Sequence, residues 1–148
     1  MPEKFCGVSV NEAVLSPLLP GGGEVTVRED GAPDPGLMCD VLVDGNRVLD
    51  ATVREVDAPL PPEDWDTALS LYSKAERRAV PFSGAAVIGA DGARVEARCD
   101  NSANSEFLLI NVGLQGDHVE KSEEAVADVE RFLNDFVSGM TRKLGCTS

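Results

Sequence analysis

Apolar and polar residues alternate along much of the chain, which is the pattern of half-buried β-strands. The alternation is clearest over 94–99, and it recurs over 39–43 and 24–29. The run 106–114 is more continuously apolar, which favours a central strand of the sheet. We therefore expect a sheet built from several short strands.

Turn residues join these strands into hairpins. The sequence Asp-Gly-Asn at 44–46 separates two β-rich runs and readily accepts positive φ angles, so we predict a hairpin over 39–56. Asp-Gly at 91–92 predicts a second hairpin over 85–99 in the same way. Because tight turns join antiparallel neighbours, the sheet should be mainly antiparallel.

Three segments have the period of a helix instead. The strongest is 119–144, where an apolar stripe follows acidic first turns and Gly145 stops the helix. Residues 8–19 predict a short amphipathic helix with Asn11 as its cap. Pro62 suits the first turn of a third helix, because its φ angle is fixed near the helical value.

The cysteines are spread along the chain without a close-spaced pair, so no structural zinc site is expected. The four are Cys6, Cys39, Cys99 and Cys146. Their number permits three pairings, and the sequence alone does not choose between them. Cys39 and Cys99 lie on the buried side of expected strands, while Cys6 and Cys146 flank helices that would pack on the sheet. We predict disulfides between Cys6 and Cys39 and between Cys99 and Cys146; the alternative is four reduced, buried cysteines in a cytosolic protein.

These elements predict an α+β fold with a mainly antiparallel sheet of about five to six strands, helices packed on it, and two disulfides. The length of 148 residues is near the usual size of one domain. We therefore expect 1–148 to form a single extracytoplasmic domain. The N-terminal residues lack the basic and apolar regions of a signal peptide, so the chain is either cytosolic or begins after a removed export signal.

The charge of the chain is strongly acidic, with 13 basic and 26 acidic residues and a net charge of −13. Such a surface repels phosphate backbones and anionic lipids, so we expect no nucleic-acid partner. The acidity indicates either a cationic ligand, metal or basic partner, or a solvated surface kept soluble by repulsion. No apolar run approaches the ~20 residues of a membrane helix, so we expect no transmembrane segment.

Candidate chemistry is sparse. His118 is the only histidine and follows Asp117, so it is either a catalytic base oriented by that carboxylate or an ordinary loop histidine. The segment 100–106 places oxygen ligands at alternate positions, as calcium loops do, but it lacks an EF-hand glycine and also fits a solvated loop. No nucleophile elbow or phosphate loop occurs. We expect no catalytic residues, no cofactor and no metal.

The aromatic pair Trp65 and Tyr72 is the candidate ligand-binding site. The chain has one tryptophan and one tyrosine, and both fall at helical spacing with Leu69. They either line a ligand pocket or form part of the core.

The arrangement of cysteines resembles uncharacterised actinobacterial secreted lipoproteins. The resemblance rests on Phe-Cys-Gly-Val at 5–8, on Met-Cys-Asp-Val at 38–41, and on the spacing of the later cysteine pair. It implies a secreted or lipid-anchored domain on the outer face of the membrane, and it carries over no functional residue. Related members often have a tryptophan where this chain has Val41, and they begin with a lipid-attachment cysteine.

These observations predict a non-enzymatic extracytoplasmic binding domain for a small ligand, a cell-envelope component or a protein. One alternative is a carboxylate-dependent hydrolase, which would need two acids facing each other in a pocket. Another is a structural or inhibitory protein that acts through the loop at 30–36.

Overall fold

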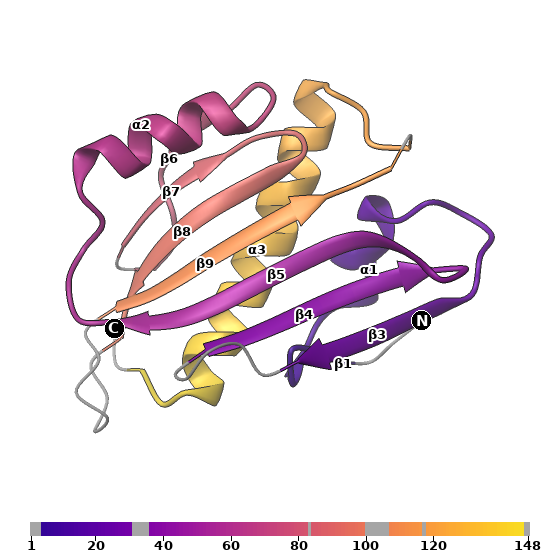
Figure 1. Ribbon diagram of the computed structural model, residues 1–148, viewed down its shortest axis with the longest axis horizontal. Helices are drawn as coiled ribbons and strands as arrows, with labels where there is room; N and C mark the ends of the chain where they lie inside the picture. The colour runs from indigo at the N-terminus through magenta and orange to yellow at the C-terminus, as the bar shows by residue number, and fades with distance from the viewer. Residues whose placement is uncertain (1–3, 31–35, 83, 100–106, 117, 147–148) are drawn as a thin grey trace.

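The computed structural model describes residues 4–30, 36–82, 84–99, 107–116 and 118–146 (Figure 1). Its helical elements are α1 (Glu12–Leu15), the 3-10 turn η1 (Ser16–Leu18), α2 (Pro62–Leu71) and α3 (Glu123–Lys143). Its strands are β1 (Lys4–Phe5), β2 (Val8–Ser9), β3 (Val25–Asp30), β4 (Gly36–Val43), β5 (Asn46–Val56), β6 (Glu76–Arg78), β7 (Gly84–Ile88), β8 (Gly92–Arg98) and β9 (Phe107–Leu114).

The main sheet is antiparallel throughout. Its seven strands have the order β3-β4-β5-β9-β8-β7-β6, and β1 pairs with β2 in a separate two-stranded sheet. The α+β class is confirmed, but the number of strands exceeds the predicted five to six. The additional strands are β6, whose Glu-Arg-Arg sequence has no apolar alternation, and the two-residue strands β1 and β2. Such short or polar edge strands leave no periodic signal.

The helices lie on opposite faces of this sheet (Figure 1). Alternate residues of β7 show the division, because Ala86 and Ile88 belong to the main core while Val87 packs with Trp65 and Ala68 of α2. The long helix α3 crosses the face that carries Ala86 and Ile88, and it lies behind the sheet in the view of Figure 1. The molecule therefore has three layers, of which the layer containing α3 buries the larger core.

The N-terminal segment differs from the single helix predicted over 8–19. Residues Val8 and Ser9 form β2, the α-helix α1 spans one turn, and η1 follows with Pro17 in its first turn. Proline has no backbone N–H to donate, so Pro17 fits the first turn of a new helix and not the interior of a longer one. The predicted cap is confirmed, because the side chain of Asn11 accepts a hydrogen bond of 2.9 Å from the backbone N–H of Ala13.

The other two predicted helices are present with shifted ends. Helix α2 begins at Pro62 as expected but ends at Leu71, so Tyr72 lies just beyond it with extended backbone angles. Helix α3 begins at Glu123, four residues after the predicted 119, because Ser122 caps it through a hydrogen bond from Ala125. Gly145 follows its end with a φ angle of 71°, as predicted. None of the described helices is long and apolar enough to cross a membrane.

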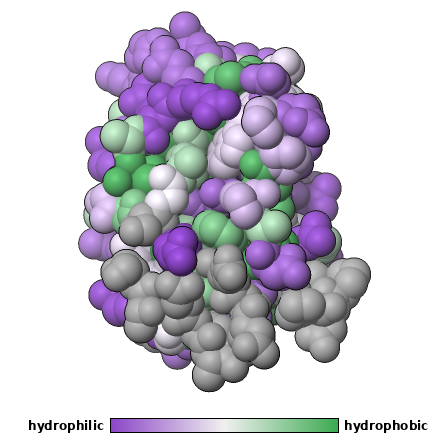
Figure 2. All heavy atoms as spheres, turned by 90° about the vertical axis from the view of Figure 1, so that its left-hand side faces the viewer, coloured by the Kyte–Doolittle hydropathy of each residue, from purple (hydrophilic) through white to green (hydrophobic). Residues whose placement is uncertain are grey.

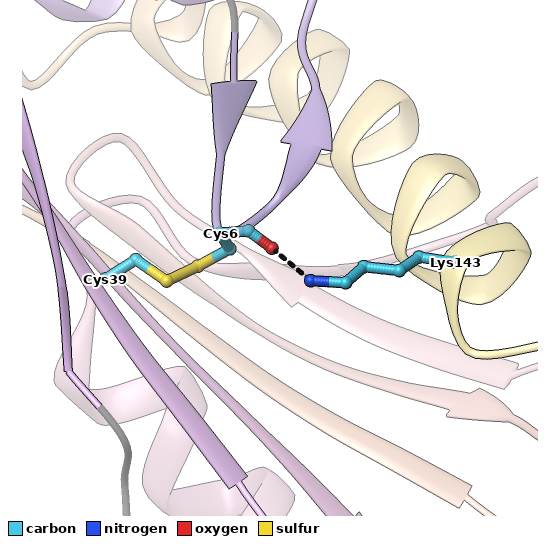
Figure 3. The surroundings of a disulfide bond; sticks show 3 residues. All are labelled: Cys6, Cys39 and Lys143. Carbon is cyan, nitrogen blue, oxygen red and sulfur yellow. Dashed lines mark hydrogen bonds between the residues drawn. A yellow bond between two sulfur atoms is a disulfide. The ribbon is translucent and has the colours of Figure 1, made fainter.

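Both predicted disulfides are confirmed. Cys6 in the turn between β1 and β2 bonds Cys39 on β4, and Cys99 bonds Cys146 after α3. Cys6 makes a second contact, shown in Figure 3. The ammonium group of Lys143 donates a hydrogen bond of 3.1 Å to the backbone carbonyl oxygen of Cys6. The N-terminal segment is thereby attached both to the sheet and to the end of α3.

Aromatic packing fills the space between the N-terminal segment and α3. Phe5 is fully buried, and its ring centroid lies 6.2 Å from that of Phe132 and 5.5 Å from that of Phe136. The disulfide at Cys6, the next residue, fixes the position from which Phe5 enters the core. The Cys6–Cys39 disulfide and the packing of Phe5 therefore both hold the N-terminal segment in place beside α3.

Replacing Cys6 and Cys39 together by alanine should lower the free energy of unfolding by about 4 kcal/mol, because the bond closes a loop of 33 residues in the unfolded chain. Urea denaturation of the double variant beside the wild-type protein measures this loss. The variant lacking Cys99 and Cys146 is the matched control and should lose a similar amount, since its loop spans 47 residues. Equal denaturation midpoints for the wild-type protein with and without reductant would contradict both expectations.

Candidate functional site

A surface cavity of about 270 Å³ lies where η1 meets the start of α3. It combines an imidazole and three carboxylates with an apolar wall. The described residues that line it are Pro17, Leu18, Ala90, Leu114, His118, Val119, Glu120, Glu124, Ala125 and Asp128. Its size is near the lower end for small-molecule pockets, which suits a compact ligand.

The imidazole of His118 is held by the backbone of η1. Its Nε2 donates a hydrogen bond of 3.1 Å to the carbonyl oxygen of Leu18, so this nitrogen carries the proton. Gly116 makes the ring position possible, because a Cβ there would lie 2.8 Å from Nδ1 of His118. Asp117, the carboxylate expected to orient His118, lies outside the described residues. The imidazole therefore has a clear structural contact through Nε2.

The carboxylates give the cavity a negative potential. Glu124 and Asp128 are four residues apart on α3, so they lie on the same side of the helix. Asp128 accepts a charged hydrogen bond from Arg131, which offsets part of its charge, while Glu120 and Glu124 are exposed at the rim. The site is therefore suited to a small positively charged group.

The structure places Trp65 and Tyr72 under and beside α2. Trp65 is 6% exposed, packs against Val87, and has the guanidinium carbon of Arg77 5.9 Å from its ring centroid. Tyr72 is half-buried and donates a hydrogen bond of 3.3 Å to the carbonyl oxygen of Ala93. The two side chains share the small core beneath α2. A ligand-binding role for them stays a prediction.

A shallow groove of about 450 Å³ runs past Trp65 at the β6 edge of the sheet. Arg77, Arg78 and the start of β7 line it together with Trp65. Tyr72 is not among the described residues that line this groove. The buried ring of Trp65 therefore borders this groove, while Tyr72 lies against the sheet.

The face of the sheet opposite α3 carries a polar row that no pattern in the sequence indicated. Arg28 on β3 pairs with Asp40 on β4, and Asp40 lies directly opposite Asp50 on β5. Asp40 is only 4% exposed, although its neighbours Cys39 and Val41 point into the main core on the other side. Its Oδ2 is 2.8 Å from a guanidinium nitrogen of Arg28, and its Oδ1 is buried without a hydrogen-bond partner.

Comparison with known protein families, with curated proteins and with solved structures finds no match to this chain. Within the described residues, no three side chains of His, Cys, Asp or Glu gather as metal ligands. The predicted loop candidates at 30–36 and 100–106 fall largely or wholly outside the described residues.

Tyr72 provides a direct check on the region between α2 and the sheet. Burial raises the pKa of its phenol above the ordinary value of 10.0, and the carboxylates of Asp50 and Asp91 raise it further while Arg94 opposes them. Because this is the only tyrosine, an absorbance titration of its phenolate should give a pKa above 10 in the folded protein.

The same shift makes stability depend on pH. Above pH 10 the unfolded chain loses the phenol proton before the folded chain does, so the free energy of unfolding should fall as the pH rises through this range. Tyr72→Phe should remove this contribution to the slope. A folded-state titration at or below 10, or an unchanged slope in Tyr72→Phe, would contradict the expected burial.

Proposed function

We propose that the protein is a non-enzymatic extracytoplasmic binding domain, secreted or lipid-anchored, whose ligand is a small positively charged molecule or a charged group of an envelope component or protein. The cavity beside His118 is the observation that carries this proposal. It is concave, it is the right size for a compact group, and its charged groups are mainly acidic.

The two disulfides support the extracytoplasmic part of the proposal. Disulfides between distant segments persist in oxidising compartments and are rare in the cytosol. All four cysteines of the chain are used in them, so none is free as a nucleophile or metal ligand. The resemblance to secreted lipoproteins agrees with this placement.

The surface supports recognition by polar groups. On the face shown in Figure 2, hydrophobic atoms lie in separate patches between hydrophilic ones. Among the described residues, the exposed large hydrophobic side chains are Met38 and Leu71, which belong to different elements. A partner held mainly by a broad apolar interface would need more such surface.

Binding fits the His118 cavity better than hydrolysis does. Nε2 of His118 is already bonded to Leu18, and the described lining contains no serine, threonine or cysteine that it could activate. The facing acids Asp40 and Asp50 lie elsewhere, on the outer face of the sheet. The directly paired acids and the only imidazole of the chain therefore lie at different sites.

Small primary amines should bind this cavity, whereas their acetylated, neutral analogues should not. Amide NMR spectra of the folded protein, recorded during titration with each matched pair, would report binding through shifts at His118, Val119 and Ala125. Glu124→Gln should weaken amine binding by about threefold to fivefold, since an exposed charge pair contributes up to ~1 kcal/mol.

Glu63→Gln on α2 is the matched control, because it removes the same charge from an exposed helical position outside the cavity. It should leave amine binding unchanged. The proposal fails if amines and neutral analogues shift the spectrum alike. It also fails if a broad hydrolase screen finds turnover that His118→Ala abolishes.

A further inference from the structure

We infer that the Asp40–Asp50 pair, together with the side-chain amide of Gln115, forms a binding site for a calcium-like divalent cation on the outer face of the sheet. This site is separate from the His118 cavity, and the inference does not depend on the function proposed for that cavity. It rests on strand register, on buried polar atoms without partners, and on the donor chemistry of the three side chains.

The register brings the two carboxylates together. Asp40 of β4 and Asp50 of β5 are directly paired, and the alternation of both strands puts their side chains on the face away from α3. Directly opposed residues of an antiparallel pair have Cβ atoms only about 4.5–5.5 Å apart, and like charges there are destabilising. A shared cation would convert this repulsion into attraction.

Asp40 supplies an independent sign of a ligand. Its side chain is 6% exposed, so the carboxylate is more than nine-tenths buried. Arg28 on the neighbouring strand holds Oδ2 at 2.8 Å, whereas the buried Oδ1 has no hydrogen-bond partner. A buried charged oxygen without a partner is costly, and it is the atom available to a cation shared with Asp50.

Gln115 brings a third oxygen to the pair. Its Nε2 donates to Oδ1 of Asp50 at 3.4 Å, and its own Oε1 is buried without a partner. A half-turn of the amide would exchange the two atoms and place Oε1 near the carboxylate. A separation of 3.4 Å is roughly that of neighbouring oxygen ligands around Ca²⁺, whose bonds are about 2.3–2.6 Å long.

A glycine leaves room for this arrangement. Gly113 on β9 is paired with Asp50, and a Cβ at Gly113 would lie 2.7 Å from Oδ1 of Asp50 and 3.2 Å from Nε2 of Gln115. Any other residue at 113 would displace the carboxylate or the amide. The backbone of β9 thus forms part of the floor beneath the proposed site.

Oxygen-only ligands select hard cations, and Ca²⁺ tolerates irregular geometry better than Mg²⁺. The protein supplies two carboxylates and one amide oxygen, so water would complete the coordination. Arg28 lowers the net negative charge of the site. We therefore expect weak binding, with a dissociation constant on the order of 10⁻⁴–10⁻³ M, as in extracellular calcium modules.

Terbium luminescence tests the inference, because Tb³⁺ replaces Ca²⁺ at oxygen sites and is excited through a nearby aromatic ring. Tyr72 is close enough for Asp50 to influence its pKa, so it can act as the donor. Wild-type protein should give saturable luminescence that Ca²⁺ reverses. Calcium alone should raise the melting temperature.

Asp50→Asn should weaken Ca²⁺ binding by on the order of tenfold, since it removes one of two carboxylates. Gln115→Glu should tighten binding, because it adds a third carboxylate. Asp66→Asn is the matched control, since it makes the same change at an exposed position on α2 and should bind as wild type.

The inference is overturned if wild-type protein shows neither saturable terbium luminescence nor a calcium-dependent melting temperature. It is also overturned if Asp50→Asn and Asp66→Asn lower the affinity equally, because the cation would then be held by overall charge. Gln115→Glu keeps the test decisive should Asp50→Asn fail to fold: unchanged or weaker binding in that variant would contradict the site.

Discussion

The packing of α3 against one face of the antiparallel sheet is the contact on which the rest of the structure depends. Its apolar stripe buries Phe132, Phe136 and Met140 completely or almost so, and the main core forms around them. Burying an aromatic side chain of this kind contributes roughly 1.5–3 kcal/mol. The two disulfides add covalent links near the C-terminal end of α3, where Lys143 contacts Cys6 and Cys146 follows the helix.

This arrangement determines where ligands can bind. Because α3 and the N-terminal segment occupy one face, polar groups collect at the margins of the core and on the opposite face. The cavity beside His118 lies at the margin, where η1 meets the start of α3. The acid pair of Asp40 and Asp50 lies on the opposite face. Both sites are acidic, in keeping with the net charge of −13.

The sequence predicted the fold class, both disulfides and the main hairpins, because periodicity and turn residues are local signals. The turn at 44–45 has positive φ at both Asp44 and Gly45, as its sequence requires. The acid pair could not be predicted, because a regular hairpin with this turn would place Asp40 opposite Leu49. A bulge between Val41 and Leu42 shifts the register by one residue and brings Asp50 there. The cavity could not be predicted from the sequence either, because it joins η1 to residues about a hundred positions later in the chain.

The state of the cysteines in freshly isolated native protein tests the disulfide-linked, extracytoplasmic domain most directly. Intact mass should be measured after alkylation with and without prior reduction, followed by peptide mapping. The two disulfides predict no alkylation before reduction, four alkylated cysteines after it, and linked peptides containing Cys6 with Cys39 and Cys99 with Cys146. Four free thiols in the native protein would contradict this prediction, and the proposal of an extracytoplasmic binding domain would lose its basis.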